Sequence, residues 1–113
     1  MKDLISYADF TKIEIRLGTI ISAELNNKLR KPSFVLKIDF GDKIGIKKSS
    51  AQLTKNYNID QLIDKQIAAV INFPKKQIGD LTSEVLVLGF PDENNEPILI
   101  NPDKKLVNGG RLY

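Results

Sequence analysis

Residues 34–40 alternate strictly between large apolar side chains and others, and this period constrains the fold more than any other feature of the sequence. The apolar residues occupy every second position: Phe34, Leu36, Ile38 and Phe40. Successive side chains of a β-strand point to opposite faces, so this spacing predicts a strand with one buried face. We therefore expect a mainly β protein, with Phe34 and Phe40 in its core.

Two neighbouring segments have the same period. From Ile13 to Ser22 apolar residues again alternate with others, which predicts a long strand. Gly18 lies in its middle, and a glycine there is typical of a bulge or sharp bend that lets one strand serve two sides of a small barrel. A turn at residues 41–42 predicts a hairpin to a third strand that contains Ile44 and Ile46.

The second half of the chain adds two strongly apolar runs. The run that starts at Gln66 and the run that follows Glu84 are apolar on both faces, which predicts two central strands. Between the third and fourth strands, a serine cap predicts a short helix from Ala51 toward Tyr57, and residues 58–62 predict a second capped turn. The proline- and glycine-containing tail predicts turns around one short strand at residues 98–100.

This order of elements predicts an all-β fold with short helices. Five strands, one of them long and bent at a glycine, indicate an OB-type Greek-key barrel with N- and C-terminal extensions, and an SH3-like barrel is the structural alternative. We expect residues 1–113 to form one domain, with residues 1–11 as an N-terminal arm and residues 90–113 as a C-terminal extension.

Composition argues for binding rather than catalysis. The sequence has no cysteine and no histidine, so the commonest general base and the thiolate and imidazole metal ligands are missing. No nucleophile, nucleotide-phosphate or metal motif is visible, and the carboxylates Asp39, Asp42 and Glu84 are scattered. We expect no enzyme activity and no cofactor. The first residues resemble neither a secretory signal nor a membrane span, so we expect a cytoplasmic protein without membrane insertion.

Basic residues occur in three separate segments that a barrel brings toward one side. They are Lys28, Arg30 and Lys31 after the first strand, Lys47 and Lys48 in the third, and Lys75 and Lys76 in the proline-stiffened segment after Phe73. The net charge is +3. A composite groove of this kind predicts salt-sensitive contacts to nucleic-acid phosphates. The alternative is that these lysines only keep exposed turns in contact with water.

Base stacking is a weaker prediction because aromatic residues make up only 7% of the chain. With Phe34 and Phe40 assigned to the core, Tyr57, Phe73 and Phe90 remain as stacking candidates. This composition favours recognition of shape and phosphates over recognition of bases.

Two further features concern the loop and the arm. Arg16 and Glu84 are expected to pair and so to hold the loop that carries Lys75 and Lys76. The arm carries the apolar residues Leu4, Ile5, Tyr7 and Phe10. Their exposure is costly, which predicts a two-fold homodimer in which arm and tail pack on the partner, with docking on the chain's own barrel as the alternative.

Ordered motifs resemble the tRNA-binding domain family from residue 9 to the end of the chain. They lie in residues 10–20, 36–57, 62–89 and 100–112 and include Ile15-Arg16-Leu17-Gly18, the motif that starts at Asn72-Phe73, and Ser83-Glu84. Ser49, Ser50 and Ala51, together with Val85 and Leu86, depart from the general family pattern toward its CsaA branch, whose members are chaperones associated with protein export.

The resemblance implies an OB fold, a homodimer, and binding of unfolded or export-bound polypeptides and of tRNA. It places Ser83 and Glu84 at a nucleic-acid surface. We expect Asn72 to belong to the same surface, together with the basic residues Arg30, Lys31, Lys47, Lys48, Lys75 and Lys76. A chaperone also needs an exposed apolar pocket, for which we select residues around the basic loop: Phe73, Ile78, Leu81 and Leu86. A tRNA-binding module without chaperone activity is the alternative function.

Overall fold

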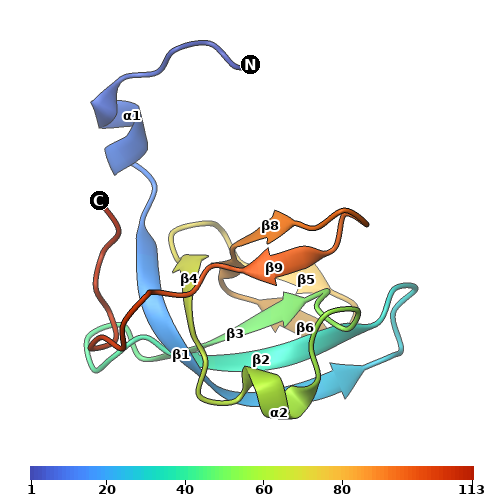
Figure 1. The fold of residues 1–113 in the computed structure, drawn as a ribbon. Helices are drawn as coiled ribbons and strands as arrows, with labels where there is room; N and C mark the ends of the chain where they lie inside the picture. The colour runs from blue at the N-terminus through green and yellow to red at the C-terminus, as the bar shows by residue number, and fades with distance from the viewer.

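The computed structural model describes residues 1–113, which form a small curled barrel with an arm that extends away from it (Figure 1). The helices are α1 (Tyr7–Thr11) and α2 (Ile59–Leu62). The strands are β1 (Ile15–Asn26), β2 (Ser33–Asp39), β3 (Ile46–Ala51), β4 (Gln66–Val70), β5 (Lys76–Ile78), β6 (Leu81–Ser83), β7 (Leu86–Val87), β8 (Gly89–Pro91) and β9 (Pro97–Leu99).

A five-stranded antiparallel sheet forms the barrel wall in the order β3-β2-β1-β4-β7. Two hairpins, β5–β6 and β8–β9, complete the β structure, and the two helices are short. The predicted all-β fold with an OB-type barrel is confirmed. No helix of the structure combines the length and the apolar composition needed to cross a bilayer.

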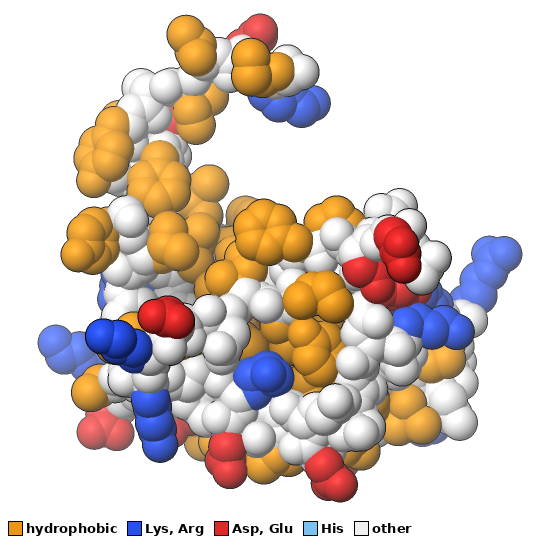
Figure 2. All heavy atoms as spheres, in the orientation of Figure 1, with side chains coloured by type: hydrophobic (Ala, Val, Ile, Leu, Met, Phe, Trp, Pro, Cys, Tyr) orange, Lys and Arg blue, Asp and Glu red, His pale blue; other side chains and the backbone are white.

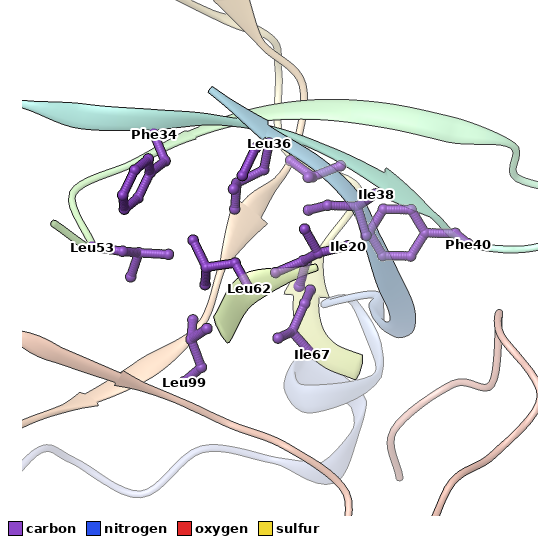
Figure 3. Packing of buried hydrophobic residues seen from close by; sticks show 12 residues of the cluster. Ile20, Phe34, Leu36, Ile38, Phe40, Leu53, Leu62, Ile67 and Leu99 are labelled. Atoms are coloured by element: carbon purple, nitrogen blue, oxygen red, sulfur yellow. The ribbon is translucent and has the colours of Figure 1, made fainter. Parts of the chain in front are cut away.

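The core fills the inside of the curled sheet (Figure 3). All four alternating residues of the sequence pattern, Phe34, Leu36, Ile38 and Phe40, are buried there, as predicted. Leu62 of α2 is fully buried in the middle of this cluster, and the capping box of Asn58 and Gln61 fixes the start of this helix. The capped turn predicted at residues 58–62 is therefore confirmed.

β1 is the strand that turns the sheet into a barrel. It pairs with β4 from Ile15 to Thr19 and with β2 from Thr19 to Asn26. The predicted irregularity is present, but it lies at Ile21 rather than at Gly18. Ile20 and Ala23 both point into the core because the extra residue at Ile21 shifts the inward-facing positions by one.

Gly18 has a packing role instead. A Cβ atom at this position would lie 2.6 Å from Ile38 Cγ2 and 2.8 Å from the Phe40 ring. We predict that Gly18→Ala lowers the free energy of unfolding by about 1–3 kcal/mol, because two buried side chains must move. Urea denaturation measures this loss. Gly110→Ala is the matched control, since nothing lies within 4 Å of its added Cβ, and equal stability of the two variants would contradict the prediction.

Two predictions for residues 44–57 are wrong. The third strand starts at Ile46 because residues 41–45 form the turn, with Gly45 at φ +84°. The helix expected from Ala51 toward Tyr57 is absent. β3 continues to Ala51, and a turn follows in which the amides of Asn56 and Tyr57 donate to the Leu53 carbonyl. Leu53 is buried in the core and anchors this turn.

The apolar run after Glu84 was predicted to form one central strand, and this prediction is wrong. It divides into β7, which pairs with β4, and β8, which pairs with β9. Leu86 and Phe90 are consequently exposed. The strand predicted near Ile98 is confirmed as β9.

Candidate functional site

A hollow of about 380 Å³ opens beside β3, where the β5–β6 hairpin meets the start of β2. Its walls combine apolar and polar side chains. The lining residues are Leu29, Ser33, Ser50, Gln52, Phe73, Pro74, Lys76, Ile78, Ser83, Glu84, Val85 and Leu86. Six predicted site residues come together there, three from the predicted nucleic-acid set (Lys76, Ser83 and Glu84) and three from the predicted apolar set (Phe73, Ile78 and Leu86).

The β5–β6 hairpin forms one wall of the hollow. Gly79 adopts φ +61° at its tip, a conformation that favours glycine. An ion pair of 3.8 Å joins Lys28 Nζ to Asp80 Oδ2, and one of 3.7 Å joins Lys75 Nζ to Glu84 Oε2. Both lysines are largely exposed, so each pair contributes about 0–1 kcal/mol. The shape of the hairpin therefore depends mainly on the pairing of β5 with β6.

Serine side chains organise the floor of the hollow. The Ser50 amide donates to Ser83 Oγ at 3.0 Å, and the Ser50 hydroxyl donates to Ser33 Oγ at 3.2 Å. Behind them, the buried Ser49 hydroxyl donates to the Val85 carbonyl at 3.1 Å. These bonds fix β3 against β6, so the floor is rigid.

Glu84 links β3 to the hairpin. Its Oε1 accepts the Lys48 amide at 3.0 Å, and its own amide donates to the Lys48 carbonyl at 2.8 Å. The predicted pair with Arg16 is wrong. The Arg16 guanidinium lies 2.7 Å from Glu14 Oε1 and donates to the Gly109 carbonyl, so it fastens the C-terminal segment to β1 instead.

The remaining predicted residues lie around the hollow or away from it. Leu81 is opposite Ile78 in the hairpin, and Lys47 is opposite Ile38 on the sheet. Arg30 is exposed in the loop between β1 and β2. Lys31 pairs with Glu96 at 3.2 Å and is thereby directed to the β8–β9 hairpin.

Asn72 has both ends of its side-chain amide occupied. Its Oδ1 accepts the Glu14 amide at 2.8 Å, and its Nδ2 donates to the Lys12 carbonyl at 2.7 Å. These bonds clamp the base of the arm to the end of β4, and they give Asn72 a structural role.

Half of the residues that line the hollow were not predicted from the sequence. Ser33, Ser50 and Gln52 lie at strand ends, where a period-two pattern carries no information about ligands. The departure of Ser49 and Ser50 from the general family pattern was the only sequence signal for this part of the lining.

Two carboxyls outside the hollow have pKa values below their ordinary range. The Ser6 backbone hydrogen bond is the main cause for Asp9, with a smaller effect from Lys12. For Asp92, the Asn56 side-chain amide lowers the pKa most, followed by the Glu96 amide. Asp9 belongs to the capping box of α1, and Asp92 accepts hydrogen bonds in the β8–β9 turn, so both stabilise local structure.

A second apolar surface lies between the arm and the C-terminal segment (Figure 2). A groove of about 580 Å³ is lined mainly by apolar residues from β1 and from residues 100–113. The arm above it has no buried residue in α1, and Leu4, Ile5 and Tyr7 are exposed. The arm is therefore not docked on its own barrel, contrary to the alternative considered above.

Residues 15–111 match the model of the putative tRNA binding domain. The chain belongs to the tRNA-binding domain family. The match covers the whole barrel, including both walls of the hollow and the C-terminal segment that the Arg16 guanidinium fastens to β1. The predicted family resemblance is confirmed.

Two solved structures of CsaA proteins superpose on nearly the whole of this chain. The CsaA chaperone of Bacillus anthracis is 42% identical with a TM-score of 0.92, covering 98% of this chain and 100% of that one. The CsaA chaperone protein of Picrophilus torridus is 47% identical with a TM-score of 0.90, covering 97% and 100%.

Curated relatives of this tRNA-binding domain include methionine–tRNA ligases. The enzyme of Methanococcoides burtonii is 36% identical over 112 residues, which cover 99% of this chain and 16% of the ligase. That of Flavobacterium johnsoniae is 30% identical over 111 residues, covering 98% and 15%. The chain thus spans about a sixth of the length of these ligases.

Proposed function

We propose that the chain is a CsaA-type binding protein without catalytic activity, acting as a chaperone for unfolded or export-bound polypeptides. The observation that carries this proposal is the hollow beside β3, in which half-exposed apolar side chains meet an ionic rim. The full-length similarity to two proteins named as CsaA chaperones supports it.

The chemistry of the hollow suits an unfolded chain. Phe73 and Leu86 offer apolar surface, and because each is about half exposed, a ligand that covers one of them gains about 0.8–1.5 kcal/mol of hydrophobic free energy. Lys76 and Glu84 at the rim provide one charge of each sign and a place for polar groups of the ligand. Such a site recognises apolar segments without selecting one sequence.

Dimerisation is part of the proposal. The exposed arm and the apolar groove below it form a surface that a second copy of the chain would cover. Two hollows in one dimer would bind two segments of the same polypeptide, and the second contact would gain from a high effective concentration. Modest affinity at each hollow is then sufficient.

Light scattering tests the chaperone activity. A chemically denatured client protein is diluted into buffer with and without an equimolar amount of the chain. We expect the protein to suppress aggregation of the client. Aggregation at the same rate in both samples, with bovine albumin as the inert control, would contradict the proposal.

Binding of tRNA is a second candidate function. It is favoured by the family match and by lysines near the hollow that have no carboxylate partner, such as Lys48 and Lys76. Their contacts would go to backbone phosphates, so the affinity would fall steeply with salt.

The double substitution Lys75→Ala with Lys76→Ala tests this second function. We expect tRNA affinity to fall several-fold because two ammonium groups are lost. The melting temperature should remain nearly unchanged, since the Lys75–Glu84 pair is exposed and Glu84 keeps its bond to the Lys48 amide. Fluorescence anisotropy and thermal denaturation measure the two effects. Unfolding of the variant would assign the pair a structural role instead.

A further inference from the structure

Two lysines face each other directly across neighbouring strands of the barrel. Lys37 of β2 and Lys48 of β3 are register partners in the antiparallel pair. Directly opposite residues have Cβ atoms about 4.5–5.5 Å apart, so both ammonium groups reach the same region of space. Both residues are exposed.

The pair lies on the outer face of the sheet. Leu36 and Ile38, the neighbours of Lys37 in β2, are fully buried on the inner face. Ser49, the neighbour of Lys48, is also buried. Since side chains alternate along a strand, Lys37 and Lys48 point outward together.

No carboxylate neutralises this pair. The ion pairs of the structure involve neither Lys37 nor Lys48. On β1, Glu24 is the register partner of Val35 and therefore lies diagonally across from Lys37. On β2, Asp39 lies two residues after Lys37. The Asp39 carboxylate accepts the Gly41 amide, and Glu84 is engaged with the Lys48 amide and Lys75.

Like charges at directly opposite positions destabilise a sheet. An anion bound between them removes this repulsion and gains attraction from both charges. A phosphate group suits the site because ammonium groups bind phosphate as point charges and need no fixed angle. The pair therefore has the properties of an anion-binding site on an otherwise regular sheet face.

We propose that Lys37 and Lys48 together bind a backbone phosphate of RNA on the outer face of β2 and β3. This inference rests on the proposed tRNA binding and adds Lys37 to its contacts. The Lys48 backbone is bonded to Glu84 at the rim of the hollow, so the phosphate site lies next to the hairpin that carries Lys75 and Lys76. The RNA backbone follows the strip from Lys37 to this hairpin.

The test is the double variant Lys37→Gln with Lys48→Gln, titrated with unfractionated tRNA between about 50 and 200 mM salt. We expect the slope of log affinity against log salt to become shallower by about 1, as for loss of one phosphate contact. Affinity at the lowest salt should fall about tenfold. The melting temperature should rise by about 2 °C, because the repulsion between the lysines is removed.

The variant Lys55→Gln with Lys104→Gln is the matched control. Both lysines are exposed and belong to no ion pair, and the net charge changes by the same amount. This control should keep the wild-type salt slope. Glu24→Gln should strengthen tRNA binding, since it removes a carboxylate diagonal to Lys37.

The outcomes separate this inference from the function on which it rests. If the wild-type protein binds tRNA and Lys37→Gln with Lys48→Gln binds with the same slope, the phosphate site is wrong and tRNA binding stands. A lower melting temperature of that variant would also overturn the inference, because it would show the lysines to be structural. If the wild-type protein does not bind tRNA at all, both proposals fail.

Discussion

Deleting residues 1–11 is expected to convert the proposed homodimer to a monomer. Leu4, Ile5 and Tyr7 have exposed fractions of 100%, 70% and 74%, so the chain's own barrel does not cover them. Burial of each large apolar side chain contributes about 1.5–3 kcal/mol. Loss of the whole arm should therefore weaken association by more than about 100-fold.

Light scattering coupled to size-exclusion chromatography measures the change in mass. The deletion keeps Lys12 and Glu14, whose contacts with Asn72 hold the start of β1, so the barrel should stay folded. The control is Lys2→Ala with Asp3→Ala, which changes only polar residues of the arm and should stay dimeric. A wild-type monomer, or a deletion variant that remains dimeric, would contradict the proposed interface.

Replacing both Phe73 and Leu86 by serine is expected to reduce affinity for an unfolded polypeptide by about 10- to 100-fold. Both residues line the hollow, with exposed fractions of 50% and 49%, so they offer apolar surface to a ligand without closing the core. Because half of each side chain is already covered, the loss is about 0.8–1.5 kcal/mol at each position, which gives this factor. Binding of tRNA should change little.

The matched control for this variant is Leu25→Ser with Ile46→Ser. These residues are similarly exposed, at 54% and 56%, and neither lines the hollow. Fluorescence anisotropy of a labelled, permanently unfolded protein compares the variants. If both double variants lose affinity equally, the polypeptide binds general apolar surface and the hollow has no special role.

The strands with one buried face could be predicted from the sequence because their pattern reports burial directly. The alternation of Phe34, Leu36 and Ile38 requires one inner face, and the structure has it. β1 was harder to predict, since the extra residue at Ile21 interrupts the pattern without a glycine or proline to mark it. The role of Gly18 depends on its distance to Ile38 and Phe40, which lie on another segment of the chain.

The wrong predictions for the helix after Ala51 and for the partner of Arg16 share a physical cause. In both places, contacts with residues distant in sequence determine the local structure. Ser49 and Ser50 extend β3 through bonds to Val85 and Ser83, which overrides the helix signal that a serine cap gives. The Arg16 side chain forms an ion pair with Glu14 and donates to the Gly109 carbonyl, and it does not pair with Glu84. Neither partner could be chosen from spacing alone.

The candidate site could be predicted in part. The segment from Phe73 to Leu86 supplies six of the lining residues that the sequence analysis selected. The opposing wall from β2 and β3 was missed, and so was Lys37, whose partnership with Lys48 depends on strand register. Register follows from the turn at residues 41–45, which begins and ends with a glycine of positive φ.

Calorimetric titration of the wild-type protein with a reduced and carboxymethylated, permanently unfolded polypeptide tests the central proposal most directly. We expect saturable binding with a negative heat-capacity change and little dependence on salt, because the hollow buries apolar surface. Saturable heat with tRNA alone, steeply dependent on salt and absent with the polypeptide, would contradict the chaperone function and leave a tRNA-binding module.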